Sequence, residues 1–122
     1  MRCMMFIKHP ETIRVENVPP ALMEAMGKFI DDSMKKGILV DTAGLKPTSD
    51  GKRIVLKGGK ISVKDGPFTE TKEVVGGYAI VKVKSMDEAM AIGREFMELH
   101  RVHWPAFEGE SEIRPLEDMP EN

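Results

Sequence analysis

The sequence predicts an α+β fold of the ferredoxin-like type, in which two helices cover one face of an antiparallel sheet. Two observations support this prediction. The inferred elements follow the order strand, helix, strand, hairpin, strand, helix, strand, which is βαββαβ with an inserted hairpin. In addition, 122 residues suffice for one domain with its own core. We expect that domain over residues 1–116, followed by a polar C-terminal tail over residues 117–122.

Composition excludes several classes of protein. The chain is 41% apolar and 31% charged, which is typical of globular rather than disordered proteins. Its net charge of −2, with acids and bases interspersed, gives no basis for a nucleic-acid surface. The apolar run Cys3–Ile7 is too short for a signal peptide or a membrane span. Cys3 is the single cysteine, so we expect no internal disulfide and a cytoplasmic location.

The first third of the chain predicts a strand and a helix. Cys3–Ile7 carries apolar side chains on both faces, so this strand must be covered twice. Residues Pro20–Lys36 predict an amphipathic helix, and Gly37 suits its left-handed cap. The apolar stripe of this helix is made of Leu22, Met23, Met26, Phe29, Ile30 and Met34.

The middle of the chain predicts two sheet strands and a hairpin. Ile38–Leu45 and Tyr78–Val83 are the sheet strands, separated by the loop 47–51 and the hairpin. Arg53–Lys57 and Lys60–Lys64 flank Gly58-Gly59. Two adjacent glycines predict a two-residue hairpin turn, because both central positions need positive φ.

The last third predicts a second helix and a final strand. Ser85 and Glu88 form a capping box, and the helix is expected to end near His100. Gly93 lies within the apolar stripe and indicates a close approach to the sheet. The stripe comprises Met86, Ala89, Met90, Gly93, Phe96, Met97 and His100. Residues 111–116 form the last strand.

This arrangement leaves one sheet face uncovered. The expected central strands, Cys3–Ile7 and Tyr78–Val83, are apolar on that face too. Because an exposed apolar sheet face favours association, we expect a homodimer whose sheets pack face to face as a dimeric α+β barrel.

The stretch Asp65–Tyr78, DGPFTETKEVVGGY, carries a family resemblance. It resembles the YCII-related, or DGPF-domain, family over roughly residues 1–115. The resemblance implies a dimeric α+β barrel and small bacterial proteins of proposed enzymatic role, some encoded beside or fused to alternative sigma factors. The better-studied branch has a His on the first helix that works with an Asp. Pro20–Lys36 contains no His, so this chemistry does not carry over.

The candidate catalytic residues are Asp65 and Asp41. Asp65 is expected beside Glu70 and Lys72 in a dimer cleft, where a carboxylate next to an ammonium can act as a general base or hold a polar ligand. Asp41 either lies solvated at a sheet edge or points into the cavity with a raised pKa. The candidate ligand-binding residues are Gly66, Phe68, Glu70 and Lys72. The alternative is that Asp65-Gly66-Pro67-Phe68 is a structural turn pinned by Phe68.

The histidines offer weak support for a metal site. His100 and His103 have HxxH spacing, but no paired Cys or HExxH pattern accompanies them. A hydrogen-bonded core histidine is the simpler interpretation of His100. We therefore expect no metal and no cofactor. The leading hypothesis is a small-molecule enzyme acting by acid/base chemistry. The alternative is a non-catalytic ligand-binding or regulatory module that works with a sigma factor.

Overall fold

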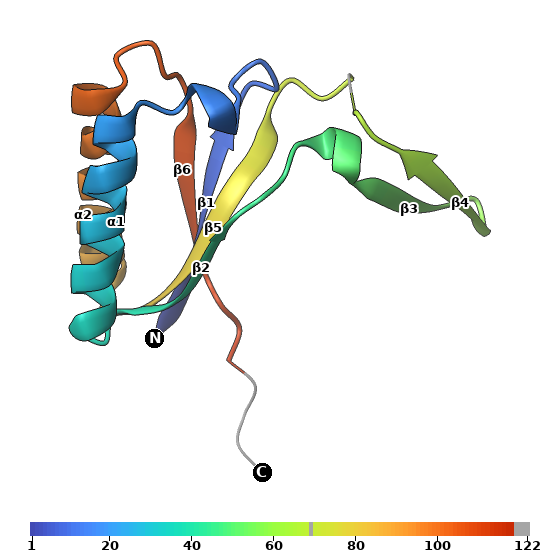
Figure 1. Ribbon diagram of the computed structural model, residues 1–122. Coiled ribbons are helices and arrows are strands. Elements are labelled where there is room, and N and C mark those ends of the chain that lie inside the picture. The colour runs from blue at the N-terminus through green and yellow to red at the C-terminus, as the bar shows by residue number, and fades with distance from the viewer. Residues whose placement is uncertain (69, 119–122) are drawn as a thin grey trace.

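The computed structural model describes residues 1–68 and 70–118. Two helices, α1 and α2, lie side by side on one face of a four-stranded antiparallel sheet (Figure 1). The elements are β1 (Arg2–His9), η1 (Val15–Asn17), α1 (Pro20–Lys35), β2 (Leu39–Gly44), η2 (Thr48–Asp50), β3 (Lys52–Lys57), β4 (Lys60–Asp65), β5 (Val74–Lys82), α2 (Met86–His103) and β6 (Glu110–Pro115).

The sheet order confirms the predicted α+β class and agrees with a ferredoxin-like arrangement. Strands run β2-β5-β1-β6, so the two strands expected to be central are central. β3 and β4 form a separate two-stranded sheet, the inserted hairpin. The dimeric barrel stays a prediction. Of the predicted tail, residues 119–122 lie outside the described residues.

Alternation along β1 separates the two faces of the sheet. Cys3 and Met5 point to the helices, where they form the core with Val81, Val83 and Ala89. Cys3 and Val81 are 0% and 1% exposed and lie opposite each other across the β1–β5 pair. The core therefore sits between the sheet and α2.

The other face of the sheet carries a second set of large side chains. Met4 lies opposite Ile80, and Phe6 lies opposite Tyr78. All four are half-buried, and both helices lie on the opposite side of the sheet. This face is therefore apolar and only partly covered by its own chain.

Helix α1 packs more loosely than its stripe predicted. Leu22 is its one buried residue, whereas Met23 and Met34 are 55% and 48% exposed. Much of α1 stands over a cavity rather than on the sheet; Met23 lines this cavity, whereas Met34 lies at the surface. The helix ends as predicted, with Gly37 at φ +73°.

Helix α2 packs closely against β6. A Cβ atom at Gly93 would lie 3.2 Å from Cδ1 of Ile113, which confirms the predicted close approach to the sheet. Ser85 caps the helix by accepting a hydrogen bond from the Glu88 amide at 3.2 Å. The helix extends three residues beyond His100, and Met90, within the predicted stripe, is 48% exposed.

Strand β5 begins at Val74, four residues before the predicted start at Tyr78. A side chain at Gly76 would overlap the His9 ring, and one at Gly77 would lie 3.0 Å from the Ala43 carbonyl oxygen. The glycine pair thus allows close packing within a strand instead of a loop. Gly58 and Gly59 have φ +58° and +76°, as the predicted hairpin turn requires.

Neither helix of the described chain is long and apolar enough to cross a membrane.

Candidate functional site

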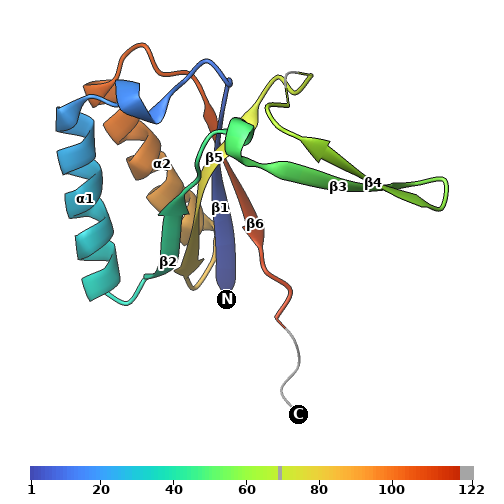
Figure 2. The same cartoon turned by 45° about the vertical axis from the view of Figure 1, so that its right-hand side comes forward.

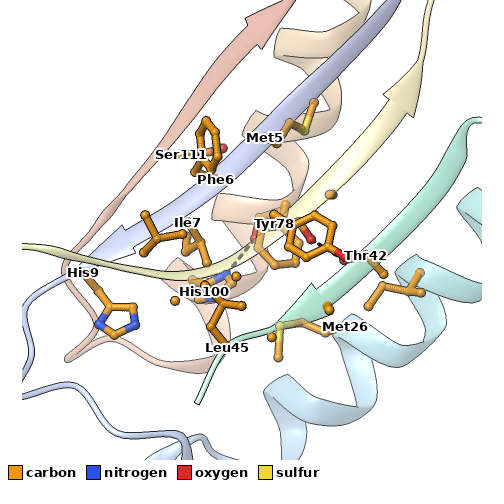
Figure 3. A pocket seen from close by; sticks show the side chains of 18 of the residues that line it. Met5, Phe6, Ile7, His9, Met26, Thr42, Leu45, Tyr78, His100 and Ser111 are labelled. Carbon is orange, nitrogen blue, oxygen red and sulfur yellow. Dashed lines mark hydrogen bonds between the residues drawn. The ribbon is translucent and has the colours of Figure 1, made fainter. Parts of the chain in front are cut away.

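A cavity of about 670 Å³ lies between the helices and the sheet. Its size falls within the roughly 300–1,000 Å³ typical of small-molecule sites. Figure 3 shows Met26 from α1, Ile7 from β1, Thr42 from β2 and His100 from α2 around this space. Most of the lining side chains are apolar, so the few polar groups determine how a ligand can be oriented.

His100 is the most deeply buried polar side chain of the described residues, at 6% exposure. Its Nδ1 lies 2.9 Å from the carbonyl oxygen of Phe96, and a carbonyl can only accept, so Nδ1 carries the proton. Burial lowers the pKa of His100, against the opposing effect of this backbone hydrogen bond. The imidazole is therefore neutral near pH 7, and Nε2 keeps a lone pair. No hydrogen bond to Nε2 is made within residues 1–68 and 70–118.

Aromatic rings hold this imidazole in place. The rings of Phe96 and Phe107 have centroids 4.8 and 4.7 Å from that of His100. The ring centroids of Trp104 and Phe107 lie 5.4 Å apart, and those of Phe29 on α1 and Phe96 lie 6.0 Å apart. These contacts leave the ring few alternative orientations and fix the position of Nε2.

Glu11 brings a second acceptor to the cavity wall. Its Oε1 accepts a hydrogen bond from Oγ1 of Thr48 at 2.5 Å. Its Oε2 is buried and has no hydrogen-bond partner in the part of the chain that the structure describes. A buried acceptor without a partner is costly, so a ligand that donates a hydrogen bond would relieve this cost.

The predicted residues of the Asp65 loop lie at the base of the β3–β4 hairpin. The Asp65 carboxylate is 73% exposed and pairs with Lys52 at 2.6 Å. The Gly66 amide donates to the Gly51 carbonyl at 3.0 Å, and the Gly66–Pro67 peptide is cis. Phe68 is 6% exposed. These contacts describe a tightly packed turn.

Glu70 and Lys72 also lie at the surface of this loop. Glu70 pairs with Lys64 at 2.5 Å and with Arg53 at 3.0 Å. The hydrogen bond from Lys64 is the main cause that lowers the pKa of Glu70. Lys72 is exposed. Among the described residues that line the cavity, none belongs to the predicted set Asp65, Gly66, Phe68, Glu70 and Lys72.

Asp41 lies on edge strand β2 and is exposed. Its Oδ2 accepts a hydrogen bond from the Tyr78 hydroxyl at 3.0 Å, on the sheet face away from the helices. This bond and the charge of Asp41 raise the pKa of Tyr78. Asp41 and Asp65 thus belong to different parts of the protein, and neither lines the cavity with His100.

The described residues contain no group of three His, Cys, Asp or Glu side chains placed to hold a metal ion. His9 lines the cavity, and its Nδ1 lies 2.8 Å from the Pro10 carbonyl oxygen. The position of His100 on the apolar face of α2 was the one sequence signal for this site. Glu11 gave no signal, because it lies in a loop without a recognisable motif.

Two comparisons relate the chain to known proteins. A sequence model described as the YCII-related domain matches residues 1–97. An uncharacterized protein of Rhizobium meliloti (strain 1021) is 34% identical over 101 residues, which cover 83% of this chain and 74% of that protein.

Proposed function

The chain belongs to the YCII-related family, and from this premise we propose that it binds a small apolar molecule in the cavity beside His100. The single observation that carries this proposal is the Nε2 lone pair of His100, held by fixed neighbours in an apolar cavity and without a donor in the described chain. The chemistry would be proton transfer without a cofactor.

The two acceptors at the cavity wall define the class of ligand. Oε2 of Glu11 is a buried acceptor without a partner in the described chain, and Nε2 of His100 is an acceptor with no donor from the described residues. A molecule with an apolar body and a hydroxyl or amine group therefore fits better than a carboxylate or phosphate. A neutral imidazole with a lone pair facing such a group can act as a general base.

We assign proton transfer to His100 in place of Asp65 and Asp41. The Asp65 carboxylate is exposed and paired with Lys52, so water and the ammonium already satisfy it. Asp41 is also exposed, and it holds the Tyr78 hydroxyl on the opposite face of the sheet. In the proposed dimer, Asp41 and Tyr78 would lie near the subunit interface.

The proposed assembly is a symmetric homodimer that covers the half-buried face formed by Met4, Phe6, Tyr78 and Ile80. Analytical ultracentrifugation of the wild type and of Phe6→Glu tests it. We expect a dimer that the substitution converts to a folded monomer.

Matched ligands test the cavity. We expect 4-ethylphenol to raise the melting temperature, and 4-ethylanisole, which lacks the donor, to raise it much less. His100→Phe should reduce this difference, because it keeps an aromatic ring but removes Nε2 and leaves Glu11 as the remaining acceptor. His103→Phe is the control, since His103 lies on the same helix outside the buried set.

Turnover of any ligand that binds distinguishes an enzyme from a binding module. If His100→Phe loses turnover but still binds part of the ligand, the result supports proton transfer by His100. Binding without turnover supports the non-catalytic alternative. Equal stabilisation of the wild type and His100→Phe by every ligand would contradict the proposed site.

A further inference from the structure

The β3–β4 hairpin projects from the protein on the side of the sheet opposite to the helices (Figures 1 and 2). Its strands pair from Lys52–Asp65 at the base to Lys57–Lys60 beside the turn, and we call residues 52–65 the arm. The contacts described between the arm and the rest of the chain lie at this base. There, the Arg53 guanidinium stacks on the Phe68 ring at 3.8 Å. The middle and the tip of the arm extend into solvent.

One face of the arm is apolar. Ile54 lies opposite Val63, and Leu56 lies opposite Ile61, so these four side chains share one face of the ribbon. They are 76%, 64%, 72% and 72% exposed, respectively. A contiguous patch of four exposed aliphatic side chains on a two-stranded ribbon is unfavourable in water and marks an interaction surface.

The opposite face of the arm is basic, with Arg53, Lys57, Lys60 and Lys64. The arm contains five basic residues and one acidic residue, which give a net charge of +4. Since the whole chain carries −2, the remainder of the chain carries −6. The arm of one copy is therefore electrostatically complementary to the body of another.

We propose that the apolar face of the arm packs against the body of a second copy of this chain, as part of the interface that also covers the half-buried sheet face. This inference rests on the proposed dimer. The arm and the half-buried sheet face lie on the same side of the protein, so one partner can cover both.

The length of the arm agrees with this partner. Six-residue strands extend about 20 Å, whereas stacked sheets lie about 10 Å apart. An arm leaving one sheet therefore reaches past a partner sheet packed against it. Twofold symmetry makes the contact reciprocal, so that two arms contribute to one closed interface.

Substitutions on the two faces of the arm test the proposal. Leu56→Glu and Ile61→Glu place a charge on the apolar face, and Val55→Glu and Ser62→Glu place the same charge on the opposite face. We expect sedimentation equilibrium to show dimer dissociation constants at least ~10-fold higher for Leu56→Glu and Ile61→Glu, and within ~3-fold of wild type for the controls. Circular dichroism and melting temperature should show that all four variants fold, since their side chains project into solvent in the single chain.

The outcomes separate this inference from the proposed function. If the wild type is a dimer and all four variants dimerise equally well, the proposed role of the arm is overturned and the proposed dimer is not. A wild type that is monomeric at every concentration would overturn both. Binding of 4-ethylphenol measured on the same samples tests the cavity independently. Binding of a DNA duplex that Lys57→Ala and Lys60→Ala abolish, with self-association unaffected by Leu56→Glu, would instead assign the arm to a nucleic-acid partner.

Discussion

Nδ1 of His100 donates a hydrogen bond to the carbonyl oxygen of Phe96 one helical turn earlier, at 2.9 Å, and this contact fixes the tautomer of the ring. Its Nε2 is thereby left as an acceptor in the cavity. The charge state of this buried side chain therefore affects stability and, in the proposed site, the binding of a hydrogen-bond donor.

The first prediction concerns pH. Burial lowers the pKa of His100 in the folded state below its usual value of 6.5. The unfolded chain then binds the proton more readily, so the stability that the neutral ring provides is present above pH 6.5 and is lost as pH falls through the folded-state pKa. Urea unfolding of the wild type and His100→Gln between pH 7.5 and 5 should show a steeper loss in the wild type. An equal dependence of the free energy of unfolding on pH in the two proteins would contradict this prediction.

Thr48 should couple two loops. Its hydroxyl donates to Glu11 at 2.5 Å and accepts from the Phe68 amide at 3.3 Å. Thr48→Val keeps the shape but removes both bonds, which leaves the Glu11 carboxylate with fewer partners. We expect a loss of about 1–3 kcal/mol in the free energy of unfolding. Thr42→Val is a matched control with one hydroxyl bond, to the Tyr78 carbonyl, and should cost less.

Gly66 should tolerate no side chain. A Cβ atom there would overlap the carbonyl oxygen of Thr48, which is backbone and cannot move aside. We expect Gly66→Ala to destabilise the protein by about 3 kcal/mol or more, measured by urea unfolding. Gly27→Ala is the control, because a Cβ atom at Gly27 on α1 meets nothing within 4 Å. That change should stabilise by up to about 1 kcal/mol.

Gly93 and Ile113 should show coupled energetics. Alanine at position 93 improves helix propensity by about 1 kcal/mol, but its Cβ would crowd Cδ1 of Ile113 at 3.2 Å. Ile113→Val removes that methyl group. In a double-mutant cycle, we expect Gly93→Ala to be more favourable by about 0.5–1 kcal/mol in the Ile113→Val background. Additive effects would show that the helix does not approach the strand so closely.

Local patterns in the sequence were sufficient to predict the order of the main helices and strands, the α+β class and the two central strands. The hairpin turn, the Ser85 cap and the packing of Gly93 each depend on residues close in sequence or on one face of an element. The strand through Gly76 was missed, because paired glycines usually mark loops, and the reason for them here is a distant ring, His9.

The cavity could not be predicted in the same way. An apolar stripe shows which side of α1 faces inward, but it does not show whether that side meets the sheet or stands above it. Met23, which lines the cavity, is 55% exposed for this reason. The unpaired oxygen of Glu11 depends on how its loop packs against the distant segment of Thr48, which no local pattern records.

The alternation of side chains along β1 between the two faces of the sheet has a further consequence. The side chains of residues 3, 5 and 7 face the helices, whereas those of residues 4 and 6 face the opposite side of the sheet. Single substitutions can therefore change one face of the sheet without changing the other. Inserting or deleting one residue near the start of this strand would exchange the two sets at once. We therefore expect related chains to differ in side-chain type here more readily than in the length of this segment.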